Sequence, residues 1–350
     1  MAASALTAKS AAASGAAVSE YRRGGMVYRR LGRTDLWVSL LSFGSHTDPA
    51  DRVPLRPQGT VLTEQGQQRR DRIIARAFDL GVNLLDVYHS EGQVEPAAKL
   101  VRGRRDKVLI SLAHEINYKS IDNACRLYGH VDLYRFHTAD IDGTALHQWD
   151  IFRKAKEAGK IRAIGIATHI EKTMVRALEQ LDGLDYIFFP YNFIYARAEY
   201  SEFLPAAIEK GVGLIAMKPL ASGSIMKLDP RARPGMKPES EPLQLWTREK
   251  KQILPAAVAE LTKSLDRMPD ETLCMAALRF VYSQPFVNTA IVGMFHDLLL
   301  EDNYKALIRY QERTTEERAA LDAAREVARL LGPDLLPPHY RWLEQKWRVG

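Results

Sequence analysis

The sequence predicts an α/β fold, an eight-stranded parallel (β/α)8 TIM barrel. Eight short, apolar and β-branched runs recur between residues 38 and 294. The stretches between them, such as "RRDRIIARAFDLG" and "HQWDIFRKAKEAGKI", carry apolar residues at helical spacing. The runs themselves are almost continuously apolar, which is typical of strands that helices bury on both faces. Alternation of this kind favours a closed barrel with its helices outside.

The elements follow one another in a regular order. Each expected strand is followed by a helical pattern, so successive strands should pair in parallel through βαβ units. Gly81, Gly159 and Gly211 each stand between a helical run and a strand, where helices commonly end on a left-handed glycine. The expected strands are "VSLLSFG" (38–44), "NLLDVY" (83–88), "KVLISLA" (107–113), "VDLYRFH" (131–137), "RAIGIAT" (162–168), "DYIFFPYN" (185–192), "GLIAMK" (213–218) and "NTAIVGM" (288–294).

Three segments fall outside the strand and helix repeat of the barrel, residues 26–332. Residues 1–25 are rich in Ala, Ser and Gly, so we expect a disordered extension. Residues 228–248 form a Pro-rich loop after the seventh strand, expected as a lid over the barrel mouth or as a surface linker. Residues 333–350 form an aromatic and basic C-terminal tail, expected to pack against the barrel or a partner protein.

Composition excludes several classes of protein. The 49 Lys and Arg residues and 43 Asp and Glu residues are spread along the chain, so we expect a solvated surface and no nucleic-acid partner. No apolar stretch is long enough to predict a membrane span. Cys125 and Cys274 lie far apart and indicate no disulfide framework, so we expect a cytoplasmic protein. An organelle transit peptide in residues 1–25 is the alternative.

Several long segments, in order, resemble one family of barrel enzymes. They include "MVYRRLGRTDLWVSLLSFG", "GVNLLDVY", "VDLYRFH", "GKIRAIGIATH" and "IVGMFHDLLLEDN". Over residues 26–310 the chain thus resembles the aldo-keto reductases. The segments "PYN", "IAMKPLASG" and "AALRFVYSQP" are similar to a branch that often ends in an iron–sulfur tail. No cysteine follows Cys274, so we expect no iron–sulfur cluster here.

The resemblance implies carbonyl reduction with NADPH by four side chains: a Tyr that donates a proton, a Lys, an Asp and a His. Without gaps, Asp86 and His137 match the Asp and the His, whereas Glu91 and Ala113 occupy the Tyr and Lys positions. A small gap would bring Tyr88 to the Tyr position, but no shift supplies the Lys. We therefore expect one carboxyl of Asp86 and Glu91 to stay protonated, or both to hold a cation. A protonated Glu91 would be a substitute acid.

The cofactor positions of the family are also changed. The family's Ser-Asn pair corresponds to Ala167 and Thr168. Its Gln corresponds to Phe188, and its aromatic residue that stacks on the nicotinamide corresponds to Met217. Asp297 stands near the position that usually presents a cation to the 2′-phosphate. The resemblance therefore implies that NAD(P) binds weakly or not at all, and that NAD is favoured over NADP. The candidate cofactor-binding residues are Thr168, Asn192, Pro219, Leu220, Gly293, His296 and Asn303.

Histidines recur after strand ends, at the face where barrels place active sites. His46, His114 and His169 follow the first, third and fifth strands. They are weak candidates for a metal site, because imidazoles and nearby carboxylates are ligands of Zn²⁺. The resemblance accounts for His137 and His169 as inherited residues, and alternate residues past a strand end can point away from the mouth, so we predict no metal. Lys218 is expected either to enter the mouth as a cation or to cap the seventh strand.

Three functions remain open for this chain. The leading one is an aldo-keto reductase-like protein that lacks standard carbonyl reductase activity; any residual activity on a small molecule would use Asp86, Glu91 and His137, with Tyr88 or Lys218 as another proton carrier. The second is a redox-silent metal or acid–base enzyme that uses His114 with the same acidic pair and His137. The third is a non-catalytic subunit that binds a protein partner through its C-terminal tail.

Overall fold

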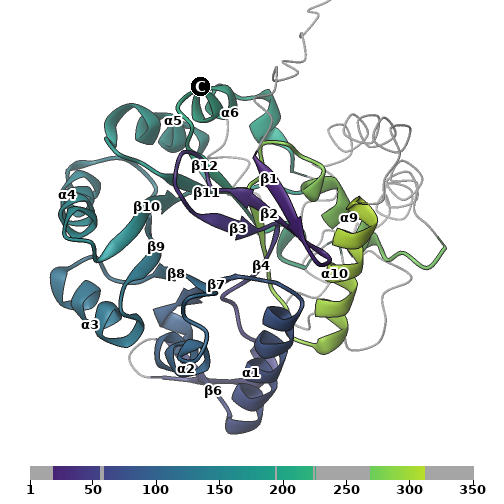
Figure 1. The fold of residues 1–350 in the computed structure, drawn as a ribbon. Coiled ribbons are helices and arrows are strands. Elements are labelled where there is room, and N and C mark those ends of the chain that lie inside the picture. The colour runs from purple at the N-terminus through teal and green to yellow at the C-terminus, as the bar shows by residue number, and fades with distance from the viewer. Residues whose placement is uncertain (1–18, 56–58, 194, 224, 226–268, 312–350) are drawn as a thin grey trace, which may run out of the picture.

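The described chain forms the predicted barrel. A computed structural model describes residues 19–55, 59–193, 195–223, 225 and 269–311, and within these residues eight parallel strands close into a barrel (Figure 1). The barrel strands are β4 (Leu41–Phe43), β7 (Leu84–Tyr88), β8 (Leu109–Ala113), β9 (Val131–His137), β10 (Ile161–Ala167), β11 (Tyr186–Pro190), β12 (Gly213–Met217) and β13 (Thr289–Val292). The last strand closes on the first, with Val292 beside Phe43. The (β/α)8 prediction is therefore confirmed.

Helices pack around the barrel with their apolar sides inward. The first helix, α1 (Glu64–Asp79), is capped by Thr63, whose hydroxyl accepts a hydrogen bond from the Gly66 amide at 3.1 Å. This helix buries Ile73 and Ala77. Gly81 follows it with a φ of 93°, as its position after a helix predicts. The described helices are α1 (Glu64–Asp79), α2 (Val94–Val101), α3 (Tyr118–Tyr128), α4 (Gly143–Glu157), α5 (Glu171–Gln180), α6 (Phe203–Glu209), α9 (Leu273–Tyr282) and α10 (Asp297–Gln311).

The first predicted strand, 38–44, is in fact two strands. Residues Trp37–Ser39 form β3, which pairs antiparallel with β2 (Met26–Arg30), and only β4 enters the barrel. The break occurs because Ser39 is hydrogen-bonded outside the barrel ladder: its amide donates to the Asn83 side chain at 2.7 Å and its carbonyl accepts from Thr289 at 2.7 Å. A continuous apolar run cannot reveal such a change of partner.

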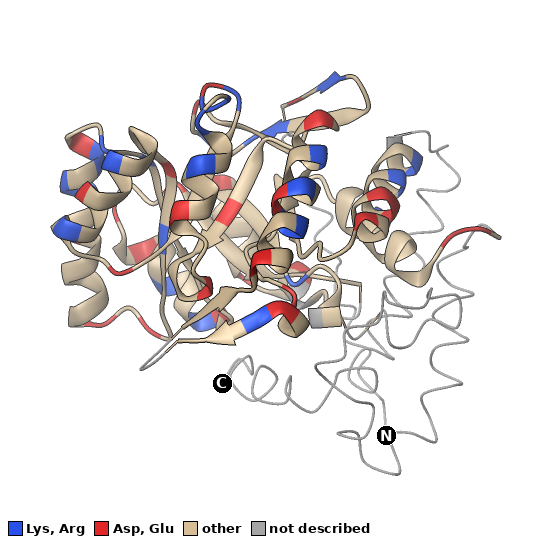
Figure 2. Ribbon diagram, turned by 90° about the horizontal axis from the view of Figure 1, so that it is seen from below, with Lys and Arg blue, Asp and Glu red and all other residues tan. Residues whose placement is uncertain are grey.

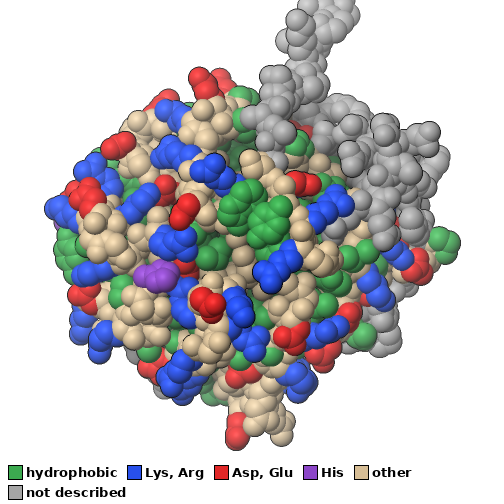
Figure 3. Space-filling view, in the orientation of Figure 1, with side chains coloured by type: hydrophobic (Ala, Val, Ile, Leu, Met, Phe, Trp, Pro, Cys, Tyr) green, Lys and Arg blue, Asp and Glu red, His purple; other side chains and the backbone are tan. Residues whose placement is uncertain are grey.

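Residues 20–23, which we expected to be disordered, form β1 (Glu20–Arg23) against β2. Tyr21 provides the side-chain contact, because its ring stacks 4.9 Å from that of Tyr28 and meets Trp37 edge-on at 5.0 Å. The β1–β3 sheet lies across the amino-terminal end of the barrel in Figure 1. Figure 3 shows hydrophobic side chains gathered over it, with Lys and Arg around them. The mouth is therefore at the opposite end.

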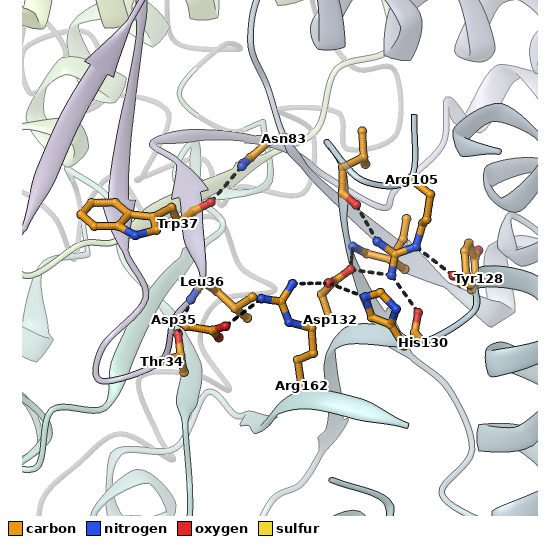
Figure 4. Close-up of polar contacts among 12 residues, drawn as sticks. Thr34, Asp35, Leu36, Trp37, Asn83, Arg105, Tyr128, His130, Asp132 and Arg162 are labelled. Carbon is orange, nitrogen blue, oxygen red and sulfur yellow. Dashed lines mark hydrogen bonds and ion pairs between the residues drawn. The ribbon is translucent and has the colours of Figure 1, made fainter. Parts of the chain in front are cut away.

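A buried carboxylate organises the amino-terminal end of the barrel. Asp132, near the start of β9, accepts hydrogen bonds from the Ile110 amide at 2.8 Å and from Arg162 at 3.0 Å. Arg105 lies 2.8 Å and His130 lies 3.2 Å from the same carboxylate (Figure 4). These partners satisfy the charge of Asp132 within the fold, so the cluster serves to hold the strands together.

The remaining sequence predictions have different outcomes. The predicted lid, 228–248, and the predicted tail, 333–350, lie outside the described residues, as do residues 1–18. Over the helices seen in Figure 2, Lys and Arg alternate with Asp and Glu. Every helix in the described part of the chain is too short or too polar to cross a lipid bilayer.

Candidate active site

Asp86 lies inside the barrel against Arg135. Its two oxygens accept hydrogen bonds from the Arg135 guanidinium at 2.6 and 3.0 Å, and the Ser111 hydroxyl donates to Oδ1 at 2.7 Å. The Arg135 and Asp86 side chains are only 0% and 1% exposed. Two charges taken this far from water are stable only when hydrogen bonds join them directly, and here a two-pronged contact does so. Asp86 therefore has a cation.

The position of this cation follows from the strand register. Tyr88 lies beside Ala113, and Ala113 lies beside Arg135, so the three residues form one row across β7, β8 and β9. From the sequence, Ala113 is expected at the position of the family's Lys. Of the two expectations for Asp86 and Glu91, a shared proton or a cation for both, the structure agrees with the second: Arg135 pairs with Asp86 from β9, and Arg52 lies near Glu91. One sequence signal was available, because Arg135 precedes His137 by two residues and so shares its inward face.

Tyr88 is the last residue of β7, at the carboxyl-terminal end of the barrel. Its ring is 5.1 Å from the Arg135 guanidinium carbon, and it meets the rings of His46 and His137 edge-on at 5.3 and 5.6 Å. Burial raises the pKa of Tyr88, and the charge of Arg135 and a hydrogen bond from it only partly offset that effect. The hydroxyl therefore stays protonated at neutral pH and is available as a donor.

Two histidines at the mouth are neutral at pH 7. Partial removal from water and then the charge of Arg135 lower the pKa of His137 to about 4. Burial and then the charge of Lys218 lower the pKa of His169 to about 3. Lys218 follows β12 and has a φ of 56°, which is unusual for a residue other than glycine. Because its charge acts on both histidines, its amino group lies near the mouth.

Glu91 does not share a proton with Asp86. It is 8% exposed and contacts the loop after β4, where His46 Nδ1 lies 3.1 Å from Oε1, Thr47 donates to Oε2 at 2.5 Å and Arg52 Nε lies 3.4 Å from Oε2. Burial alone would raise the pKa of Glu91, but together these partners lower it to about 2. Glu91 is therefore ionised at neutral pH. The hypothesis of a protonated Glu91 acting as the acid is wrong.

The ionised state of Glu91 gives a pH-dependent contribution to stability. Because its folded pKa of about 2 is below the ordinary value of 4.5, the contribution is complete above about pH 4.5 and is lost as the pH falls through 2. We expect Glu91→Gln to lower the free energy of unfolding by up to about 3 kcal/mol at pH 7. Urea unfolding at several pH values measures this loss, which should shrink below pH 4.5. Glu95→Gln, an exposed change on α2, is the control, and a pH-independent loss would contradict the assignment.

The weak metal candidates have separate surroundings. His46 contacts Glu91, His114 stacks on His89 with ring centroids 4.5 Å apart, and His169 follows β10. Among the residues that the structure describes, no three His, Cys, Asp or Glu side chains are placed to hold a metal ion. His114, which the redox-silent hypothesis used, stacks on His89 at the rim, whereas the described hydrogen bonds of Asp86 come from Ser111 and Arg135. His89 had not been singled out from the sequence.

The candidate cofactor residues follow four neighbouring strands of the barrel. Thr168 follows β10, Asn192 follows β11, Pro219 and Leu220 follow β12, and Gly293 follows β13. The Asn192 side-chain Nδ2 donates a hydrogen bond to the Lys218 backbone carbonyl at 3.1 Å, which connects the loops after β11 and β12. These residues therefore line one side of the mouth, whereas Asp86, Tyr88, Arg135 and His137 come from β7 and β9.

Ion pairs involve both His296 and Asp297, in the loop where the family usually presents a cation to the 2′-phosphate. His296 Nε2 lies 3.7 Å from Asp48, and Asp297 lies 3.9 Å from Arg72 on α1. Arg72 and Asp297 are both well exposed, so their pairing is weak. Asn303 lies buried in α10, and its Nδ2 has no hydrogen-bond partner among the described residues.

Comparisons with known proteins extend over most of the chain. A model of the aldo/keto reductase family matches residues 59–326. L-galactose dehydrogenase of Arabidopsis thaliana is 24% identical over 329 residues, which cover 85% of this chain and 95% of the relative. L-glyceraldehyde 3-phosphate reductase of Escherichia coli O157:H7 is 24% identical over 338 residues, covering 86% and 93%. The apo structure of an aldo-keto reductase from Bacillus halodurans has a TM-score of 0.62 at 24% identity, covering 85% of this chain and 95% of that one, and shares the fold.

Proposed function

Because the chain belongs to the aldo/keto reductase family, we propose that it is a nicotinamide-linked oxidoreductase with a rearranged set of reacting side chains. One observation carries this proposal: Arg135 is hydrogen-bonded to Asp86 and lies under the ring of Tyr88. Tyr88 thus replaces the missing family Tyr, and Arg135 replaces the missing Lys. Arg135 cannot lose its proton at neutral pH, so the cation is permanent.

The residues of the mouth divide the chemistry of carbonyl reduction among them. When bound, a reduced nicotinamide would supply the hydride for the carbonyl carbon. As the C=O electron pair moves to oxygen, the Tyr88 hydroxyl gives its proton to that oxygen, and the alcohol forms. Neutral His137 orients the oxygen by donating its N–H. Arg135 stabilises the phenolate that Tyr88 briefly becomes, and Asp86 holds Arg135 in place.

The cofactor residues fit a dinucleotide only in part. The buried Asn303 Nδ2 is a donor that an adenine ring could satisfy, and Gly293 is an exposed turn where a phosphate could approach. Against this, Phe188 lies 4.0 Å from the Arg135 guanidinium carbon and is used by the barrel interior. Asp297 adds a negative charge to the loop. We therefore keep the proposal of weak NAD(P) binding with NAD favoured over NADP.

The same features favour slow turnover of generic aldehydes. The raised pKa of Tyr88 makes it a weaker acid than the family's Lys-assisted Tyr, and the nicotinamide contacts are reduced. Binding energy from hydroxyl groups of the substrate would help to position it. Since the relatives named above act on a sugar and a sugar phosphate, we propose small polyhydroxylated aldehydes as substrates. The two free cysteines are consistent with a proposed cytoplasmic location.

The proposal is tested by nucleotide binding and by turnover. We expect a dissociation constant for NADPH above about 10 μM and a smaller one for NADH. We also expect NADH to be oxidised faster with L-glyceraldehyde 3-phosphate than with benzaldehyde. Nucleotide fluorescence and absorbance measure these quantities. Low-micromolar NADPH binding would refute weak binding. The absence of turnover with either nucleotide and either aldehyde would refute the oxidoreductase proposal and favour the non-catalytic subunit.

A further inference from the structure

Glu91 gives His46 a fixed orientation at the mouth. An ionised carboxylate can only accept hydrogen bonds, so His46 Nδ1 is the donor in the 3.1 Å contact with Oε1. The imidazole tautomer that makes this contact has its proton on Nδ1. The other ring nitrogen, Nε2, then carries a lone pair. The His46 side chain is 61% exposed, so the ring is accessible to a small molecule at the mouth. A histidine oriented by a carboxylate in this way is the arrangement of a general base.

The remaining partners of Glu91 make the arrangement rigid. Thr47 donates to Oε2 and Arg52 lies near the same oxygen, so Oε1 is left for His46. The backbone carbonyl of His46 also accepts a hydrogen bond from the buried Arg70 at 3.1 Å. Both the ring and the backbone of His46 are therefore held. Glu91, which the sequence predicts at the position of the family's proton donor, is therefore a positioning residue for His46.

Hydrogen-bond donors stand next to this base. The Tyr88 ring contacts the rings of both His46 and His137, and the Arg135 guanidinium packs on its face. Tyr88 is protonated and His137 is neutral, so each has a proton to offer to an oxygen. The buried Arg135 charge stabilises negative charge that develops above it. The histidine that would act as base and the groups that would stabilise an oxyanion are therefore neighbours of one ring, that of Tyr88.

We propose that the mouth also catalyses a proton transfer that needs no cofactor, the enolisation of a small α-hydroxy aldehyde or ketone. His46 Nε2 removes the proton from the hydroxyl-bearing carbon, and the C–H electron pair becomes the C=C bond. The carbonyl electron pair moves to oxygen, which takes the proton of Tyr88 and gives an enediol. His46 then returns its proton to the former carbonyl carbon while Tyr88 regains one from the second hydroxyl. The net reaction is isomerisation of the aldehyde to the ketone.

Hydrogen exchange tests this proposal without any nicotinamide. The purified full-length protein is mixed with DL-glyceraldehyde in D2O, and proton NMR follows the loss of the C2 proton and the formation of dihydroxyacetone. We expect both to exceed the rate in buffer alone. His46→Ala should lower the enzymic rate by about a hundredfold. Glu91→Gln, which keeps the shape but weakens the hold on His46, should lower it by about tenfold.

A matched histidine separates catalysis from general effects of the mouth. His89 is exposed at the same rim but contacts His114 and the Ala113 carbonyl, so His89→Ala should leave the exchange rate unchanged. Free imidazole should partly restore the rate of His46→Ala, which a purely structural role would not allow. Exchange no faster than in buffer, or an unchanged rate in His46→Ala, would overturn the proposal. Neither result bears on the nucleotide assay, so failure here is distinct from failure of the oxidoreductase.

Discussion

Replacing Arg135 with methionine is expected to lower the free energy of unfolding by about 3–5 kcal/mol. The change leaves the Asp86 carboxylate 1% exposed, with Ser111 as its one remaining hydrogen-bond partner among the contacts described above. An uncompensated charge in the barrel interior must either be protonated or admit water, and both cost free energy. The packing of the guanidinium on Phe188 is lost as well. Urea unfolding followed by circular dichroism measures the effect.

A second variant separates the lost charge from the lost packing. In Asp86→Leu with Arg135→Met, the whole ion pair is replaced by apolar side chains, so we expect much of the stability to return. A double variant as unstable as Arg135→Met would show that shape, and not charge, decides. A loss below about 1 kcal/mol in Arg135→Met would show that Asp86 is readily protonated, and would contradict the assignment of Arg135 as its required cation.

Replacing Tyr88 with phenylalanine is expected to lower kcat/KM for carbonyl reduction by about 10²–10⁴. Only the hydroxyl is removed, so the ring can still contact Arg135, His46 and His137. The free energy of unfolding should change by less than about 1 kcal/mol, because the hydroxyl makes ordinary hydrogen bonds. Steady-state kinetics with NADH and L-glyceraldehyde 3-phosphate, together with urea unfolding, measure the two effects.

The matched control is another tyrosine of the barrel wall. Tyr134 on β9 points outward, where its hydroxyl donates to the Glu115 carbonyl at 3.0 Å, so Tyr134→Phe should leave kcat/KM within about twofold of the wild-type value. Turnover that survives Tyr88→Phe would show that the proton comes from elsewhere. Lys218, whose charge reaches both His137 and His169, would then be the next residue to replace.

The outline of the fold could be predicted because it depends on local patterns. Apolar runs and helical spacing identified the barrel strands, and glycines after helices marked their ends, as the φ of 93° at Gly81 confirms. The same patterns could not show that Ser39 leaves the ladder or that Tyr21 adds a strand, because both depend on contacts with residues distant in the sequence. The predicted lid and tail remain predictions.

The sequence by itself determined that Asp86 and His137 belong to strands of a parallel barrel, and its family resemblance predicts Glu91 and Ala113 at the positions of a Tyr and a Lys. Only the tertiary structure decided what those replacements mean. Arg135 reaches Asp86 across 49 residues of chain because β7 and β9 flank β8, and Glu91 meets His46 across 45 residues because two loops converge at the mouth. Ionisation depends on such neighbours and on burial, so packing decides that the pKa of Glu91 is lowered and that Asp86 has Arg135 as its partner.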